Sequence, residues 1–226
     1  MGTSSGYDMP KGEQWRELRD DVDKFLKSLL DEAAKKLIDE AAKDMFRSYV
    51  RANGGAESMA RGEVPDADGR KAKTPSAACV VSAKIGRVLA SATSGSSGGR
   101  ISIDLLEPTQ PARTLDEYAA RQALLDILDV SQDATDLSEI LGKFLGAYLY
   151  HRFRRDSYEL CVEKQGVQQA ALSLERVRRF IEDFASAKVA TEMVAAGDWE
   201  RNSLPLSEQI FKHILEGLDE QNEDRH

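Results

Sequence analysis

Apolar residues recur every three or four positions along most of this chain. Such stripes run from Glu13 to about residue 53, and they return at about 76–93, 114–128, 136–166, 173–189 and 206–218. This spacing gathers apolar side chains on one face of a helix, whereas a half-buried strand alternates every second residue. The pattern predicts an all-α protein with a helical, bundle-like body.

Local signals mark several helix ends. Thr114, followed by Leu, Asp and Glu117, has the spacing of a capping box and predicts the start of a helix. Glycines commonly follow the last turn of a helix. Gly54 is expected to end the second stripe, Gly166 the long stripe from residue 136, and Gly197 the stripe that begins at residue 173.

One predicted helix has an unusually flat face. Small residues recur at every fourth position of the stretch 76–93, namely Ala78, Ser82, Gly86 and Ala90. Residues four apart lie on one face of a helix. We therefore expect another backbone to approach this face closely.

Stretches rich in Gly, Ser and Pro, without an apolar period, divide the chain. The division is a mobile N-terminal tail (1–12), an N-terminal helical segment (13–53), a linker (54–75), a basic helix with a Gly/Ser-rich flexible loop (76–113), a C-terminal helical domain (114–220) and a frayed end (221–226). Whether the helices form one domain or two stays open.

Composition excludes several classes of protein. A net charge of -8 argues against nucleic-acid binding by the protein as a whole, because phosphate contacts need clustered Lys and Arg. No stretch is apolar enough for a signal peptide or a membrane span. Cys79 and Cys161 lie in apolar stretches without paired spacing, so we expect reduced core thiols in a cytoplasmic protein with no membrane contact.

Catalytic signals are missing from the sequence. His151, His213 and His226 lie far apart on different predicted elements, so no metal-binding pair or Cys/His dyad can be drawn. The stretch from Gly95 to Arg100 lacks the residue order of a phosphate-binding loop. We expect a non-catalytic protein that carries neither a metal nor a cofactor.

A basic segment stands out in this acidic chain. Between Gly69 and Ile103 there is no Asp or Glu, whereas six basic residues occur: Arg70, Lys71, Lys73, Lys84, Arg87 and Arg100. Such a cluster would attract a phosphate-bearing ligand, a nucleic acid or an acidic protein surface. It is equally consistent with a solvated linker and one basic helix face.

Gly2 would carry the most reactive amine of the chain once Met1 is removed. An α-amino group titrates near 7.7–8.0, far below a lysine at about 10.4, so more of it is neutral and nucleophilic at pH 7. N-myristoylation requires Ser or Thr at the sixth position, where this chain has Gly6. Composition alone favours a terminus without a function.

Three features of the sequence are shared with one known family. The chain opens Met1-Gly-Thr-Ser-Ser-Gly-Tyr7 with Pro10 close by, a basic Ala/Gly/Ser-rich middle follows at 70–100, and the stretch 114–123 has a form similar to IDEAIAREA. Apolar helices then follow at 137–160 and 173–189. In content and order these features resemble QatB, a component of the Qat anti-phage defence system.

The resemblance implies a partner and a chemistry. Qat systems combine QatB with an ATPase, a TatD-like nuclease and QatC, which resembles QueC, an enzyme that activates a carboxylate with ATP and joins it to an amine. Gly2 would then be the acceptor of a deazaguanine-type conjugation. The residues Thr3, Ser4, Ser5, Gly6 and Tyr7 would lie extended in the partner's cleft, with Tyr7 as an aromatic anchor.

The sequence thus predicts a non-catalytic substrate and adaptor subunit of an anti-phage complex, with the catalytic groups on QatC. The alternatives are a module that binds nucleic acid or an acidic partner through the basic segment, and a plain helical scaffold.

Overall fold

The computed structural model describes residues 12–28, 35–65, 71–94, 112, 114–130, 136–192 and 196–219. Its elements are α1 (Glu13–Ser28), α2 (Lys35–Ala52), α3 (Gly55–Ala60), β1 (Arg61–Pro65), β2 (Lys71–Pro75), α4 (Ala77–Ser94), α6 (Leu115–Val130), α7 (Leu137–Gln165), α8 (Val167–Glu192) and α9 (Ala196–Asp219). The predicted helical bundle is confirmed. The tail 1–11, the Gly/Ser-rich loop at 95–111 and the end at 220–226 lie outside the described residues.

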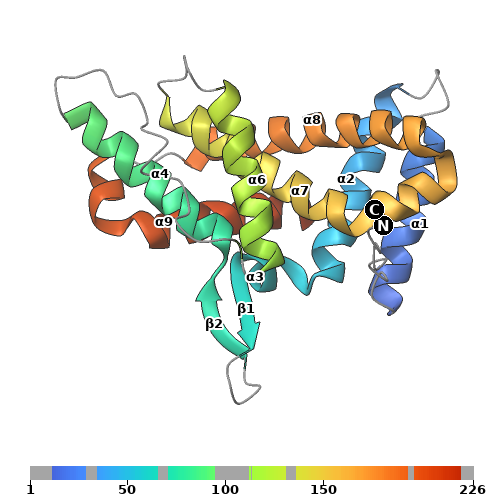
Figure 1. The fold of residues 1–226 in the computed structure, drawn as a ribbon, viewed down its shortest axis with the longest axis horizontal. Helices are drawn as coiled ribbons and strands as arrows, with labels where there is room; N and C mark the ends of the chain where they lie inside the picture. The colour runs from blue at the N-terminus through green and yellow to red at the C-terminus, as the bar shows by residue number, and fades with distance from the viewer. Residues whose placement is uncertain are drawn as a thin grey trace, which may run out of the picture.

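Helices α7 and α8 form the long axis of the bundle (Figure 1). They run antiparallel and are joined at Gly166, whose φ of 77° lies in the left-handed region that suits glycine. Two glycines of α7 bring the helices very close together. A Cβ on Gly142 would lie 2.6 Å from the Cα of Ser186, and one on Gly146 would lie 2.7 Å from the Cα of Glu182.

The other helices pack around this pair. Helices α1 and α2 cover one end of it, α4 and α9 lie toward the other end, and α6 crosses α7 (Figure 1). Buried side chains from all these helices form one contiguous hydrophobic core. Phe46 of α2, for example, meets Phe153 of α7 with ring centroids 4.8 Å apart. The N-terminal and C-terminal helices therefore share a core.

The flat face of α4 lies in the interior, as its small residues predict. Ala78, Ser82, Gly86 and Ala90 are all buried, and α9 packs against α4. Gly86 is the point of closest approach, because a Cβ there would lie 2.0 Å from Cε3 of Trp199. Helix α9 does pack on this face, but the atoms that meet Gly86 belong to the Trp199 side chain, so the expected close approach of a backbone is not what the structure shows at this glycine.

The predicted boundaries around α9 are wrong. Helix α8 ends at Glu192, and Gly197 lies inside α9 instead of capping the preceding helix. The final helix begins near residue 196 and bends where Asn202 leaves helical geometry (φ -128°, ψ 28°), three residues before Pro205. A proline inside a helix lacks an N–H donor and bends the helix, so a sequence rule reads it as a boundary.

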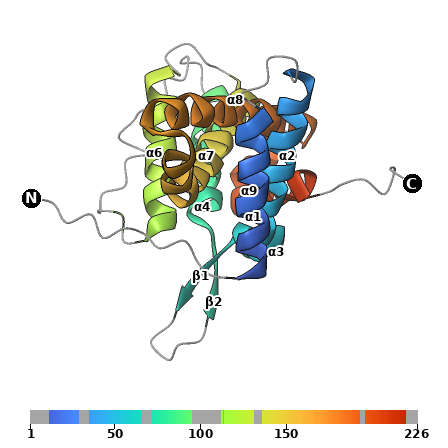
Figure 2. The ribbon, with the colours of Figure 1, turned by 90° about the vertical axis from the view of Figure 1, so that its right-hand side faces the viewer.

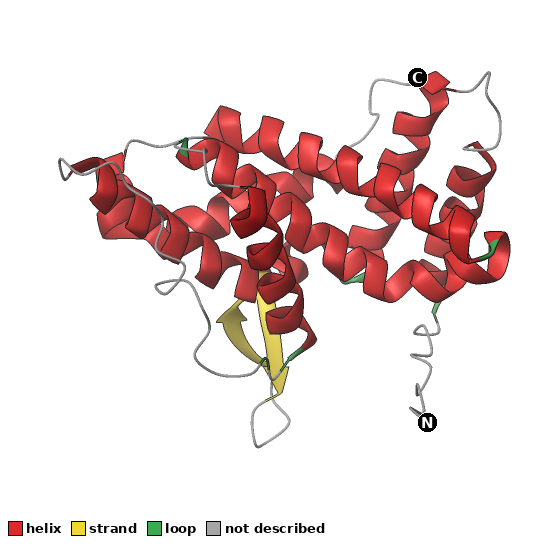
Figure 3. Ribbon diagram, turned by 45° about the horizontal axis from the view of Figure 1, so that its top comes forward, coloured by secondary structure: helices red, strands yellow, loops and turns green. Residues whose placement is uncertain are grey.

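The expected linker at 54–75 is also wrong, because it contains α3 and an antiparallel β1–β2 hairpin. Glu63 lies opposite Lys73 in the hairpin, and Arg61 lies opposite Pro75. The base of the hairpin is fixed to the body where the backbone N–H of Ser76 donates to the carbonyl oxygen of Ala60 (3.2 Å). Figure 3 shows the two strands projecting away from the helices. Short polar strands lack the apolar alternation that would have predicted them.

The capping box at the start of α6 is confirmed in both directions. The backbone N–H of Glu117 donates to Oγ1 of Thr114 (3.1 Å), and the backbone N–H of Thr114 donates to Oε2 of Glu117 (3.3 Å). These two bonds satisfy donors that the first turn of a helix leaves free. Among the described helices, none is long and apolar enough to cross a membrane.

Candidate functional site

The predicted modification site begins ahead of the described body. Gly2 and the recognition residues Thr3, Ser4, Ser5, Gly6 and Tyr7 lie outside the described residues. The structure does describe where this peptide joins the bundle. Gly12, Glu13 and Gln14 are exposed, Trp15 is half-buried, and Leu18 is the first core residue of α1.

Polar contacts hold α1 firmly against the rest of the bundle. Ser48 of α2 donates to the carboxylate of Asp21, and Lys164 near the end of α7 forms an ion pair with Asp23 (3.2 Å). The side chain of Gln165 donates to the carbonyl oxygen of Leu26 (3.3 Å). The helix that follows the N-terminal peptide is thus fixed by α2 and by the α7–α8 turn.

The six basic residues predicted as a contact patch are divided by the fold. Arg70 and Arg100 lie outside the described residues, and Lys71 and Lys73 belong to β2, of which only the backbone is described. Lys73 has Glu63 opposite it in the hairpin register, so its strand neighbour is an acid. Lys84 and Arg87 lie one turn apart on the exposed face of α4. The structure therefore brings Lys84 and Arg87 together.

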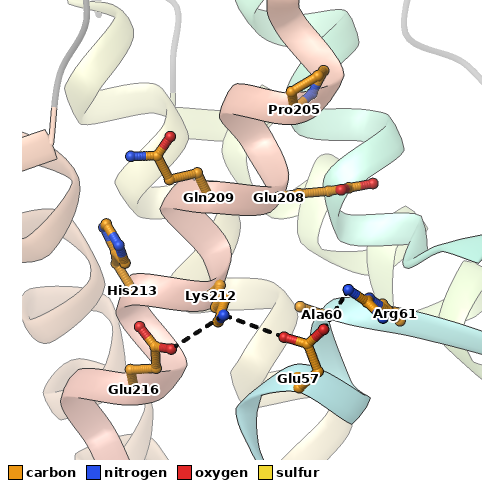
Figure 4. Close-up of a pocket in the computed structure, with 9 residues that line it drawn as sticks. All are labelled: Glu57, Ala60, Arg61, Pro205, Glu208, Gln209, Lys212, His213 and Glu216. Atoms are coloured by element: carbon orange, nitrogen blue, oxygen red, sulfur yellow. Dashed lines mark ion pairs between the residues drawn. The ribbon is translucent and has the colours of Figure 1, made fainter.

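A hollow of about 360 Å³ lies between the α3–β1 junction and α9 (Figure 4). Most of its charged side chains are already engaged in ion pairs with one another. Lys212 pairs with Glu57 (3.3 Å) and with Glu216 (3.5 Å), and Arg61 pairs with Glu57. These ion pairs connect α3 and β1 to α9. The hollow is therefore lined mainly by paired charges, and not by reactive groups that converge on one point.

A buried polar network joins the N-terminal end of α4 to α6 and α7. One carboxylate oxygen of Asp116 accepts from the backbone N–H of Ala77 (2.6 Å), and the other accepts from the hydroxyl of Tyr148. Arg152 donates to the Tyr148 hydroxyl (3.2 Å) and lies 3.5 Å from Asp116. Burial raises the pKa of Tyr148, so this hydroxyl is a proton donor at neutral pH.

The network continues into α2. Arg152 also donates to Oδ1 of Asn53 (3.4 Å), and the amide nitrogen of Asn53 donates to the carbonyl oxygen of Tyr49 (2.9 Å). The hydroxyl of Tyr49 donates to the buried carboxylate of Asp156 (2.9 Å). Burial alone would lower the pKa of Arg152, but Tyr148, Tyr49 and Asp116 raise it, so the guanidinium stays charged.

This network was not predicted from the sequence. The capping-box pattern included Asp116, but it gave no sign that this carboxylate would cap α4 and meet Tyr148, 32 positions away. Charge spacing predicts contacts within a helix, where residues three or four apart meet. No comparable rule predicts pairs between helices. The network connects α2, α4, α6 and α7, and little of its polar surface is exposed to solvent.

The cysteines and the described histidines are held in structural roles. Cys79 and Cys161 are free and buried, as predicted, and burial raises their pKa to about 12 and about 11. His151 lies 3.0 Å from Asp126, and His213 lies 3.1 Å from Glu192. The part of the chain that the structure describes contains no cluster of three or more His, Cys, Asp or Glu that could hold a metal ion.

Comparisons with known proteins give no match to the chain among family models, curated proteins or solved structures.

Proposed function

We propose that this chain is the substrate and adaptor subunit of a Qat-type anti-phage complex, in which a QueC-like partner conjugates the amine of Gly2. The support comes from the opening Met1-Gly-Thr-Ser-Ser-Gly-Tyr7, which resembles QatB, and from the way in which the peptide joins the body. The observation that carries the proposal is that α1 is anchored while its first turn stays exposed. A peptide ahead of Gly12 is therefore attached to a fixed, accessible base.

Chain length is compatible with this function. Gly2 lies ten positions ahead of Gly12, and an extended chain spans at most about 3.3–3.6 Å per residue, which gives a reach of up to about 35 Å. That distance is enough for the amine to enter a cleft of a partner while the partner rests against the bundle. The segment from Thr3 to Tyr7 would be bound in extended form, with the Tyr7 ring as its anchor.

The proposed reaction is an amide synthesis on the partner. The partner would transfer the adenylyl group of ATP to a carboxylate and release pyrophosphate. The neutral amine of Gly2 would attack the acyl carbon, forming a C–N bond, while AMP leaves and the amine proton passes to a base of the partner. This chain supplies only the nucleophile, whose low pKa relative to lysine favours the neutral form.

Intact-mass measurement of the chain tests the proposal. The protein would be purified from cells that contain its operon neighbours, from cells that lack the QueC-like partner, and from cells whose partner cannot bind ATP. We expect a mass increase in the first sample alone. An unchanged mass in all three samples would contradict the proposal.

A second candidate function is binding of nucleic acid or an acidic partner through the basic segment. It is favoured by the shared exposed face of Lys84 and Arg87. Reversing both charges should weaken such binding, and the weakening should depend on salt, because salt screens exposed charges. Affinity that is unchanged across salt concentrations would exclude this function.

A further inference from the structure

Helix α6 has two apolar faces, and the bundle buries one of them. Leu124 and Ile127 are in the core. On the other side, Leu115 and Tyr118 are each 53 % exposed, and Leu125 is 47 % exposed. These three large side chains form a stripe, which we call the α6 stripe.

The spacing of the α6 stripe is that of a helix-pairing seam. With Gln122 it follows the series i, i+3, i+7, i+10 from Leu115 to Leu125. A repeat of three and four is the pattern that coiled-coil helices present to a partner helix. A peptide bound in extended form would instead present every second one of its side chains to the surface, so its period would not match that of the stripe. The geometry of the stripe therefore fits a helix.

Three basic side chains without an ion-pair partner among the described residues lie on α6 and on the neighbouring α4. Arg121 is exposed on α6, and Lys84 and Arg87 are exposed on the neighbouring α4. Among the described residues, none of these three side chains forms an ion pair with a carboxylate. Glu117 is also exposed on α6, but it is engaged in the capping box.

The basic residues and the α6 stripe lie on one side of the molecule. The N-terminal ends of α4 and α6 are joined where Ala77 donates to Asp116 (2.6 Å). Figure 1 shows α4 and α6 diverging from the point where they meet, with α9 behind α4, and Figure 2 shows α6 at the left edge of the bundle with α4 nearer its middle. The exposed residues of α4 lie opposite its buried small face, which packs toward α9, so they point outward with the stripe.

Two other occupants of the α6 stripe, a second copy of this chain and a nucleic acid, fit these features less well. A second copy of this chain, paired two-fold through the middle of the stripe, would bring Arg121 close to its own copy, and like charges repel. A nucleic acid would satisfy the basic residues but would leave Leu115 and Leu125 without an apolar contact.

We propose that the α6 stripe, with Arg121, Lys84 and Arg87 beside it, is the docking site for an amphipathic helix of a partner protein. The partner helix has an apolar seam that packs on the stripe and acidic side chains that pair with the three basic residues. The site is independent of the chemistry proposed for Gly2, and it would give the adaptor a second surface.

Two synthetic peptides can test this site on the full-length protein. Both are amphipathic helices with leucine in the seam, and they carry glutamate or lysine at the remaining positions. Fluorescence anisotropy should show that the glutamate peptide binds at least about tenfold more tightly than the lysine peptide, with a salt-dependent affinity.

Variants then locate the binding. Leu125→Glu and Arg121→Glu should each weaken binding of the glutamate peptide about tenfold or more, since they remove an apolar contact and a charge pair. Leu172→Glu and Arg176→Glu alter exposed residues of α8 and should have no effect. Because all four side chains are exposed, circular dichroism should show that each variant keeps its fold.

Several results would overturn the proposal. One is equal binding of the two peptides, and another is equal weakening by the α6 and α8 variants. A molecular mass that doubles with concentration and falls on Leu125→Glu would identify a second copy as the occupant. Competition by a single-stranded oligonucleotide would identify a nucleic-acid surface. If the peptide binds only after residues 95–111 are replaced by a short linker, the natural occupant of the stripe is that segment of the chain itself.

Discussion

Trp199 of α9 packs so closely on Gly86 of α4 that a Cβ carbon at position 86 would lie 2.0 Å from Cε3 of the indole. The Trp199 side chain is fully buried, so it has no free space into which to move. Gly86→Ala should therefore destabilise the protein, since overpacking costs about 1–3 kcal/mol and alanine regains about 1 kcal/mol of helix propensity. We expect a net loss of up to about 2 kcal/mol in urea unfolding.

Gly217→Ala is the matched control for this prediction. The atoms nearest to a Cβ at position 217 are Cε and Nζ of Lys188, which form the end of a flexible side chain, at 2.5 Å and 2.8 Å. The lysine can swing aside, and Cζ of Phe184, 3.2 Å away, would have to shift only slightly. The propensity gain should therefore leave this variant as stable as the natural protein or more stable. Equal destabilisation by both changes would contradict the close packing of α4 on α9.

Gly146→Ala tests the contact between α7 and α8. The added methyl group would lie 2.7 Å from the Cα of Glu182, and backbone cannot rotate out of the way as a side chain can. We expect a net loss of up to about 2 kcal/mol, because moving the two central helices apart costs about 1–3 kcal/mol and alanine regains about 1 kcal/mol of helix propensity. Thermal unfolding followed by circular dichroism measures it, and a melting temperature at or above that of the natural protein would refute it.

The buried network predicts unequal effects of two changes at Asp116. Asp116→Ala removes the partner of Arg152 and of the Tyr148 hydroxyl, and leaving such part-buried polar groups without a partner costs about 1–3 kcal/mol. Asp116→Asn keeps an acceptor for Tyr148 and should cost less. Urea unfolding of both variants checks the order, and equal losses would show that the negative charge of Asp116, which both changes remove, accounts for the whole effect.

A pH series tests the contact between α6 and α7 at Asp126. Burial alone would raise the pKa of Asp126, but the hydrogen bond from His151 and the charges of His151 and Arg178 lower it below its ordinary value. When the pKa of a carboxyl group is lower in the folded than in the unfolded protein, its ionised form stabilises the fold. This stabilisation is fully present above the unfolded pKa of about 3.9, and it is lost as the pH falls through the pKa of the folded protein. Asp126→Asn should thus be less stable at pH 6, and its deficit should shrink below about pH 4. A deficit that stays constant down to pH 2 would contradict this assignment.

The sequence predicts the helices well where apolar spacing and local chemistry agree. The capping box from Thr114 to Glu117, the turn at Gly166 and the small face around Gly86 are all found as expected. These signals are local, since each depends on residues within about one or two turns of each other.

Features that depend on distant contacts were missed. The β1–β2 hairpin consists of two short strands with little apolar alternation, so no period marks it. The bond between Asp116 and the N-terminal end of α4 joins residues 39 positions apart. Of the predicted site, Lys84 and Arg87 share an exposed face. Their relation to Arg121 and to the α6 stripe could not be predicted, because it depends on the contact between α4 and α6 in the fold.

The proposed role of the N-terminal amine gives a further prediction. Adding one residue ahead of Gly2 would displace the nucleophile by more than 1 Å, and a 1 Å error can cost about a hundredfold in rate. Gly2→Pro replaces the amine with a hindered ring amine and fixes φ. Both changes should abolish conjugation in the presence of the partner, whereas Lys11→Arg should leave it intact. Conjugation that persists on Gly2→Pro but is lost on Lys11→Arg would identify the lysine as the acceptor.

The most direct test of the proposed function is tandem mass spectrometry of the N-terminal peptide, from cells that express the chain with all of its operon neighbours and resist phage. The proposal predicts that the added mass is localised to the α-amine of Gly2 and disappears when the QueC-like partner is inactive. An N-terminal peptide found only as unmodified glycine, in cells whose defence is intact, would contradict it.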